Sequence, residues 1–248
     1  MLLTDKRKAI ILGSGGAKGL AHLGVWKVLK EMGMDSVDFI AGTSMGAVIG
    51  AMMANNLNVL ELIRVMRNMS QTDWLKIFSP HIPVSGFVSG RNVRKFLEKF
   101  LTVNQIEELQ VPFGCAAYNY DLCDPEFLTS GGLLDALRAS MSIPIIFDPY
   151  KIGDTYYLDG GLGNPLPIKD VEALGIDKYL VVNVLQKPVK RDIDKALLKR
   201  LNILKRKHKE DEPKLFDIAL RNISIIEWEL AKSQLELHKP KYLVTIDT

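Results

Sequence analysis

Residues 37–54 contain the sequence feature that most constrains the fold. A short apolar run, Val37–Ala41, leads into Gly42-Thr-Ser44-Met-Gly46, and a run of small and apolar residues, Met45–Ala54, follows. This order predicts a buried strand, a sharp turn and a helix. A Gly-x-Ser-x-Gly sequence at such a junction is typical of a nucleophile elbow, in which a strained serine backbone leaves room only for glycine at the flanking positions. The alternative is a glycine-punctuated turn that happens to contain a serine.

The rest of the chain alternates between strand and helix signals. The predicted strands are Ala9–Leu12, Val37–Ala41, Val111–Tyr118, Glu126–Thr129, Tyr156–Asp159, Lys178–Val184 and Tyr242–Ile246. The predicted helices are Leu20–Met32, Met45–Ala54, Asn58–Met69, Arg91–Leu101, Leu133–Ala139 and Leu215–Leu237. Alternation of this kind predicts an α/β fold, a three-layer α/β/α sandwich around a mostly parallel sheet. With 248 residues, we expect one domain, 1–248, in which 187–248 form a basic helical C-terminal part.

The segment Gln71–Gly90 lacks a clear periodicity. It contains Pro80, Pro83 and Gly86. Proline and glycine interrupt regular structure, so we expect an irregular segment that could act as a lid at the edge of a site.

A second glycine-rich turn follows the first predicted strand. The sequence Gly13-Ser-Gly15-Gly16-Ala-Lys18-Gly19 opens a helix, and such a turn gathers backbone N–H groups around an anion. The third glycine comes one residue late for a dinucleotide-binding loop, and Lys18 is followed by glycine rather than Ser or Thr, as a phosphate-binding Walker loop requires. An oxyanion formed during acyl transfer needs only one or two N–H groups, so this interpretation leads.

A serine nucleophile needs a base, and the histidines are poor candidates. His22 lies in the first helix, His81 in the irregular segment, and His238 at the end of the last helix. His208 lies within a run of charged residues, and neither His208 nor His238 is excluded by its order in the chain. The competing base is Asp159, which follows an aromatic strand and precedes Gly160 and Gly161; a simple Asp-Gly turn is the alternative.

Taken together, these blocks resemble the patatin-like phospholipases. The Gly13–Gly19 loop, Gly42-Thr-Ser44-Met-Gly46 and Asp159-Gly160-Gly161 occur in the family's order, and Arg138–Pro149 is similar to the stretch that precedes the family's aspartate. The resemblance covers about two-thirds of the chain, roughly Ala9–Pro167. It implies a Ser–Asp dyad without histidine and without a metal or organic cofactor.

The resemblance assigns a role to each matching residue. Ser44 would be the nucleophile and Asp159 the base, with the N–H groups of Gly15 and Gly16 as the oxyanion hole and Met45 as a further contributor. The supporting motif positions are Gly13, Lys18, Gly19, Gly42, Gly46, Gly160 and Gly161. Lys18 stands where many members have arginine, so it keeps the charge but loses the planar fork for bidentate contacts. Ser14 stands where many members have another glycine.

An aspartate near its ordinary pKa of about 4 is a feeble base at neutral pH. We therefore expect the apolar neighbours Tyr157, Leu158 and Leu162 to raise the pKa of Asp159 by desolvation. Asp154, in a polar turn five residues earlier, is expected to be exposed and serves as a control carboxylate.

Composition limits the partners and the setting. A net charge of +3 gives no reason to expect nucleic acid. The N-terminal residues show no signal-peptide pattern, and no apolar run is long enough to span a bilayer. The two cysteines, Cys115 and Cys123, have neither a metal-binding nor a disulfide spacing. We therefore expect a cytoplasmic protein. Within Lys187–Lys214, eleven Lys/Arg outnumber five Asp/Glu; this amphipathic stretch either packs on its own domain or contacts an anionic membrane surface.

The sequence thus predicts a serine hydrolase that acts on lipid or other acyl esters through Ser44 and Asp159. Two alternatives stay open. The same dyad could pass the acyl group to an alcohol, as a transacylase, or the Gly13 loop could bind a nucleotide or another anion without catalysis. The sequence does not predict the preferred acyl-chain length, the preference for one ester position of the lipid over another, or the oligomeric state.

Overall fold

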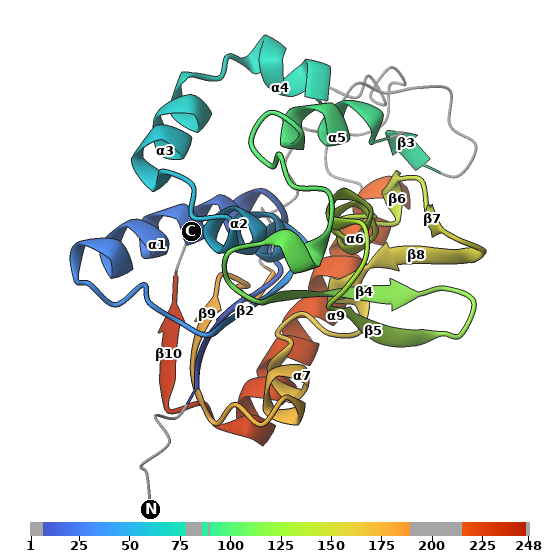
Figure 1. Cartoon of the computed structure of the whole chain (residues 1–248). Coiled ribbons are helices and arrows are strands. Elements are labelled where there is room, and N and C mark those ends of the chain that lie inside the picture. Colours follow the sequence, from blue (N-terminus) through green and yellow to red (C-terminus); the bar gives the residue numbers. More distant parts are fainter. Residues whose placement is uncertain (1–6, 78–85, 89, 189–214, 247–248) are drawn as a thin grey trace, which may run out of the picture.

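The computed structural model describes residues 7–77, 86–88, 90–188 and 215–246, and a mixed sheet of eight strands forms its centre (Figure 1). Seven strands follow one another in space as β10 (Tyr242–Thr245), β9 (Lys178–Asn183), β1 (Lys8–Leu12), β2 (Phe39–Thr43), β4 (Phe113–Asn119), β8 (Thr155–Asp159) and β7 (Tyr150–Ile152). The eighth strand, β5 (Asp124–Leu128), pairs with β4. A separate parallel pair joins β3 (Gly86–Val88) and β6 (Ile145–Phe147).

The expected α/β architecture is confirmed, but only part of the sheet is parallel. The strands β10, β9, β1, β2 and β4 pair in parallel, whereas β5 and β8 run antiparallel to β4, and β7 runs antiparallel to β8. The chain between β4 and β5 and the chain between β7 and β8 are too short to contain a crossover helix. Parallel neighbours need such a crossover, so these strands form hairpins instead.

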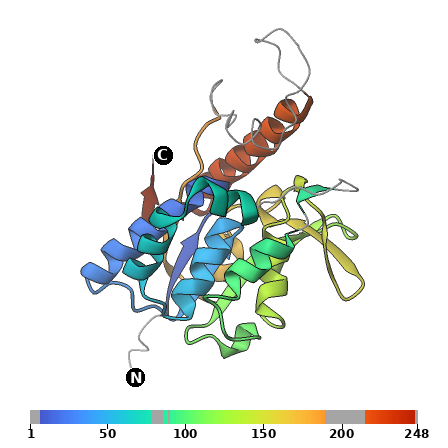
Figure 2. The same cartoon turned by 90° about the horizontal axis from the view of Figure 1, so that it is seen from above.

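Helices cover both faces of the sheet. One face carries α1 (His22–Glu31), α2 (Met45–Ala54), α3 (Val59–Asn68), α5 (Arg91–Leu97) and α6 (Leu133–Ser140). The other face carries α7 (Ile168–Ala173) and the longest described helix, α9 (Leu215–His238), which Figure 2 shows in red. No described helix, α9 included, is long and apolar enough to cross a membrane.

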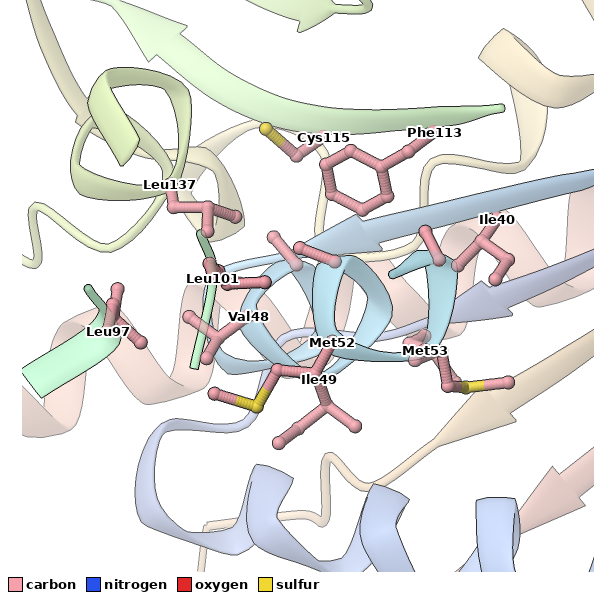
Figure 3. Packing of buried hydrophobic residues seen from close by; sticks show 14 of the residues in the cluster. Ile40, Val48, Ile49, Met52, Met53, Leu97, Leu101, Phe113, Cys115 and Leu137 are labelled. Carbon is pink, nitrogen blue, oxygen red and sulfur yellow. The ribbon is translucent and has the colours of Figure 1, made fainter. Parts of the chain in front are cut away.

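The two larger hydrophobic cores lie on opposite faces of the sheet, because successive side chains of a strand point to opposite faces; a small third cluster surrounds Tyr157. In β1, Ile10 and Leu12 join the core beneath α2, while Ala9 and Ile11 join the core beneath α7 and α9. Residues from Gly46 to Ala54 in α2 are all buried, which fits a helix that is apolar all round (Figure 3). The central strands β1, β2 and β4 are thus buried on both sides, and α2 packs in the larger core.

Most predicted elements lie where expected, but the prediction for Gln71–Gly90 was wrong in part. The structure has a helix, α4 (Gln71–Ile77), and the strand β3 within it, while residues 78–85 and 89 lie outside the described residues. The helix predicted from Leu20 begins as a 3-10 turn, η1 (Gly16–Ala21), before α1. Two further 3-10 turns, η2 (Ile106–Glu108) and η3 (Gly160–Leu162), were not predicted.

The strands β2 and β8 meet end to end on β4, and this arrangement positions the site. Along β2 the parallel pairing ends with Thr43 opposite Ala116, and along β8 the antiparallel pairing begins with Asp159 opposite Ala117. Because β5 occupies the other edge of this part of β4, β2 and β8 share one edge and approach each other from opposite directions. The carboxyl ends of both strands therefore meet at one point.

Candidate active site

Ser44 occupies the strained position that the elbow pattern predicts. It has φ 54° and ψ −121°, a left-handed conformation that non-glycine residues seldom adopt, and it caps the N-terminus of α2. A β-carbon at Gly42 would lie 2.5 Å from the Gly46 carbonyl oxygen, and one at Gly46 would lie 2.2 Å from the Leu12 carbonyl oxygen. Both glycines are required because backbone atoms approach each other closely on either side of the serine.

The structure brings Ser44 and Asp159 together. The Ser44 hydroxyl donates a hydrogen bond to Asp159 Oδ2 over 2.6 Å. The two residues are 3% and 1% exposed, so water is largely excluded from the pair. A short bond from a hydroxyl to a carboxylate in a dry environment is the geometry that a base needs to take the serine proton.

Burial raises the pKa of Asp159 to about 7, although the hydrogen bonds from Ser44 and Gly161 and the charge of Arg138 oppose this shift. The Gly161 N–H donates to the second carboxylate oxygen, Oδ1, over 2.8 Å and so fixes the orientation of the group. The direction agrees with the sequence-based expectation for the pKa. Asp154, the control carboxylate, is fully exposed and faces Lys151.

The loop after β1 lies directly against this elbow. A β-carbon at Gly46 would also lie 2.5 Å from the Gly13 carbonyl oxygen, and one at Gly19 would lie 2.5 Å from Met45 Cβ. Gly16 has φ 52°, which glycine adopts freely, and a β-carbon there would meet nothing within 4 Å. Within the described residues, the N–H groups of Gly15, Gly16 and Met45 have no hydrogen-bond acceptor. Because Met45 follows Ser44 and packs against Gly19 of this loop, these unbonded N–H groups are candidates for stabilising a developing oxyanion.

The glycines after Asp159 let other chain segments come close. A β-carbon at Gly160 would lie 2.2 Å from the Ala116 carbonyl oxygen on β4. One at Gly161 would lie 2.1 Å from Glu227 Oε1 on α9. The Asp-Gly-Gly turn is thus clamped between β4 and α9, which explains why both positions are glycine.

Lys18 is not a freely solvated surface lysine. Its Nζ donates to Gln186 Oε1 over 3.1 Å, and the residue is half-buried within η1. A single ammonium group can still attract an anionic headgroup, but it does so as a point charge. Its role in substrate binding stays a prediction.

The two described histidines have structural partners away from the serine hydroxyl. The ring of His22 is hydrogen-bonded through Nε2 to the Gly13 carbonyl oxygen over 2.8 Å, and burial lowers its pKa to about 4, so it is neutral. His238 Nδ1 lies 2.8 Å from Glu172 Oε2, at the end of α9. His81 and His208 lie outside the described residues. His22 therefore holds the glycine loop through the carbonyl group of Gly13.

Four supporting residues received no role from the sequence: Thr43, Arg138, Ser140 and Asn164. The Ser44 N–H donates to Ser140 Oγ over 2.8 Å, and the Thr43 hydroxyl donates to the Asn164 carbonyl oxygen over 2.8 Å. The Arg138 side chain is buried, its guanidinium lies over the rings of Phe147 and Tyr150, and burial lowers its pKa to about 10. Arg138 and Ser140 belong to a block already noted in the sequence, but no local pattern shows that a distant serine holds the Ser44 backbone.

The cysteines have no role in this site. Cys115 is a buried thiol in β4, as expected, and burial raises its pKa to about 12, while Cys123 is exposed. In the described part of the chain, no three His, Cys, Asp or Glu side chains form a group that could hold a metal ion.

Comparisons with known proteins agree with this geometry. The family model for "Patatin-like phospholipase" matches residues 10–171. An uncharacterized NTE family protein of Mycobacterium tuberculosis is 32% identical over 181 residues, covering 73% of this chain and 50% of its own length. The lysophospholipase nte1 of Neurospora crassa is 29% identical over 185 residues, covering 73% of this chain and 12% of its own length.

The chain thus spans about half the length of its mycobacterial relative and a small part of the fungal one. The crystal structure of VipD from Legionella pneumophila has the same fold, with a TM-score of 0.55, 14% identity and coverage of 94% of this chain and 67% of VipD. The family model covers well over half of the chain and contains the elbow, the glycine loop and the Asp-Gly-Gly turn. This chain belongs to the patatin-like phospholipase family.

Proposed function

We propose that this protein is a serine hydrolase of lipid acyl esters, of the phospholipase A or lysophospholipase type. The observation that carries the proposal is the buried hydrogen bond of 2.6 Å from the Ser44 hydroxyl to Asp159 Oδ2 at a strained strand-to-helix turn. Membership of the patatin-like family and the likeness to fungal lysophospholipases support lipid esters as the substrate class.

In the first half of the reaction, Ser44 Oγ attacks the ester carbonyl carbon while Asp159 takes the hydroxyl proton. The carbonyl oxygen becomes an oxyanion beside the free N–H groups of Gly15, Gly16 and Met45, and the positive end of the α2 dipole adds to its stabilisation. When the ester C–O bond breaks, the leaving alcohol takes the proton from Asp159. An acyl-Ser44 ester remains.

In the second half, water attacks the acyl carbon and gives its proton to Asp159. The bond from the acyl carbon to Ser44 Oγ then breaks, Oγ recovers a proton from Asp159, and the fatty acid leaves. A carboxylate with its pKa near neutrality can both accept and return a proton at physiological pH, so the raised pKa of Asp159 suits both halves.

The experiment is fluorophosphonate labelling combined with fatty-acid release from a lysophospholipid. We expect the wild-type protein to be labelled at Ser44, and Ser44→Ala to show neither labelling nor hydrolysis. Asp159→Asn should lose hydrolysis, whereas Asp154→Asn, which changes an exposed carboxyl five residues away, should behave as wild type. Labelling that persists in Ser44→Ala, or full hydrolysis by Asp159→Asn, would refute the dyad.

A transacylase is the second candidate, because an alcohol can replace water in the second half. Adding a lysolipid acceptor to the assay separates the two: a transacylase forms a diacyl product in preference to free fatty acid. A protein that binds a nucleotide at the Gly13 loop, by contrast, would show a thermal shift with NAD(P) or ATP and no labelling of Ser44.

Peripheral membrane contact is a further part of the proposal. It concerns the basic stretch 187–214, of which residues 189–214 lie outside the described residues. Co-sedimentation with vesicles tests it, and equal binding to neutral and anionic lipid would remove the electrostatic contribution.

A further inference from the structure

Glu227 is a buried carboxyl beside the proposed active site, and the reaction above does not use it. It lies on α9, beyond residues 10–171 that the family model matches, and it is 9% exposed. The Ser14 hydroxyl lies 3.2 Å from Glu227 Oε1. Ser14 immediately precedes Gly15 and Gly16, so α9 reaches the loop that carries the oxyanion donors.

The same carboxyl also touches the turn that carries the base. A β-carbon at Gly161 would lie only 2.1 Å from Glu227 Oε1 and 2.9 Å from Ser14 Oγ. Gly161 is the residue whose N–H holds Asp159 Oδ1. The Glu227 side chain thus lies between the Gly13–Gly19 loop and the Asp159-Gly160-Gly161 turn, the two segments that flank Ser44.

The other contacts of α9 bring it to the same end of the sheet. Gln234 accepts a hydrogen bond from the Leu166 N–H over 3.0 Å and donates to Asn164 Oδ1 over 2.8 Å. The Ser14 N–H in turn donates to the Pro165 carbonyl oxygen over 2.9 Å. These hydrogen bonds fix the position of α9 along the 164–166 segment. A shift of α9 that moved Glu227 away from Ser14 would break them.

We propose that Glu227 is a positioning residue that holds the oxyanion loop, through Ser14, against the Asp159-Gly160-Gly161 turn. This inference rests on the proposed hydrolase function. It assigns Ser14, which stands in place of a glycine, a specific purpose: its hydroxyl gives α9 a point of attachment to the loop.

The geometry also requires Glu227 to be neutral while the enzyme works. A carboxylate beside Ser14 would place a negative charge next to the N–H groups that must stabilise an oxyanion. Burial and the charge of Asp159 raise the pKa of Glu227 to about 8, despite the hydrogen bond with Ser14. Two hydrogen bonds and the charge of Arg138 favour the anion of Asp159, whereas only the hydrogen bond with Ser14 favours the anion of Glu227, so Glu227 is the carboxyl that keeps its proton more readily.

Among the residues that the structure describes, Asp159 is the charged group that shifts the pKa of Glu227. Asp159 acts on it across η3, and Arg138 of α6 acts on Asp159. Next to Glu227 on α9, the Trp228 ring has two ammonium groups near it: Lys187 Nζ, from the segment after β9, at 5.8 Å, and Lys232 Nζ of α9 at 5.7 Å. When the pH rises above neutrality, ionisation of Glu227 should therefore lower the rate and produce an alkaline limb.

The test compares Glu227→Ala and Glu227→Gln by kcat, KM and pH profile with p-nitrophenyl butyrate. In Glu227→Ala the loop loses its attachment, and we expect kcat to fall roughly tenfold with little change in KM, less than the ~10²-fold or greater loss on removing an oxyanion donor. Glu227→Gln has the same shape and is always neutral, so it should restore kcat at pH 7 and abolish the alkaline limb. Glu229→Ala and Glu229→Gln, at an exposed position of the same helix, are the matched controls and should match the wild type.

Wild-type kcat in Glu227→Ala, or an alkaline limb that persists in Glu227→Gln, would overturn the inference. If Glu227→Ala does not fold, the pH profile of Glu227→Gln still decides. Failure of the proposed function is distinguishable, because the wild-type protein itself would then fail to hydrolyse the ester or to be labelled at Ser44.

Discussion

Ser44 Oγ and Asp159 Oδ2 lie 2.6 Å apart although the two residues are 115 positions apart in the chain. They meet because β2 and β8 approach end to end along one edge of β4, with Thr43 opposite Ala116 and Asp159 opposite Ala117. The parallel and antiparallel parts of the sheet join at this point. The antiparallel strand β8 thus delivers the carboxylate to the serine.

The first prediction concerns how the two side chains act together. Ser44→Ala, Asp159→Asn and the double variant should all lower kcat by a similar factor, about 10³-fold or more, since members of one catalytic unit have non-additive effects. Steady-state hydrolysis of p-nitrophenyl butyrate measures this. If the double variant instead loses the product of the two single losses, the residues act independently and the dyad is wrong.

The second prediction is an acid limb in the pH profile. Because burial raises the pKa of Asp159 to about 7, protonation of this base should lower kcat/KM tenfold per pH unit below that value. An unperturbed aspartate would give the limb near pH 4. A rate that stays constant from pH 7 down to pH 5 would contradict the burial argument.

The third prediction is that Asp159 destabilises the fold at neutral and alkaline pH. A folded-state pKa that is raised above the unfolded value means that the folded protein binds the proton more tightly. The contribution of Asp159 to the free energy of unfolding is therefore fully present below about pH 4 and is lost as the pH rises through about 7. Asp159→Asn should therefore raise Tm at pH 8 by several degrees and by much less at pH 5. Thermal melts at both pH values measure this, with Asp154→Asn as the exposed control.

Parts of this site were predictable because their chemistry is local. Gly42, Ser44 and Gly46 lie within one turn, and the strained turn restricts those positions in any fold. The same holds for Asp159-Gly160-Gly161, where close packing against β4 and α9 leaves no room for a β-carbon.

The contacts that were not predicted are long-range. Ser140 holds the Ser44 backbone across 96 positions, and Glu227 meets Ser14 across 213. Ser140 lies in the stretch Arg138–Pro149 already noted in the sequence, but nothing in that stretch shows that its hydroxyl bonds the Ser44 backbone. Glu227 is a glutamate in an amphipathic helix, which is a common pattern. The strands β5 and β8 were predicted, but their antiparallel direction and the strand β7 were not. Alternation of strands and helices predicts crossovers, whereas the hairpin of β7 and β8 depends on the length of the turn between them.

The fourth prediction tests one of these long-range contacts. Ser140→Ala would leave the buried Ser44 N–H without its acceptor, which costs about 1–3 kcal/mol. The loss would fall on the strained backbone of Ser44, the proposed nucleophile, so kcat should decrease together with stability. Ser142→Ala is the matched control: its hydroxyl is equally buried but bonds to the Arg138 carbonyl oxygen one turn back on α6, so kcat should change little. Equal losses of kcat in the two variants would show that Ser140 acts only through general packing.

The fifth prediction concerns the close approach of α2 to the β1 loop. A β-carbon at Gly46 would lie 2.2 Å from the Leu12 carbonyl oxygen and 2.5 Å from that of Gly13, and backbone atoms cannot move aside as a flexible side chain can. Gly46→Ala should therefore push α2 off β1, lower Tm markedly and abolish fluorophosphonate labelling of Ser44. Gly24→Ala is the control, because Gly24 lies in α1 with nothing within 4 Å of an added β-carbon, and alanine favours the helix by about 1 kcal/mol. Tm should rise in Gly24→Ala and labelling should be unchanged. If Gly46→Ala kept both the wild-type Tm and the label, the packing of the elbow against the oxyanion loop would not be needed for the nucleophile.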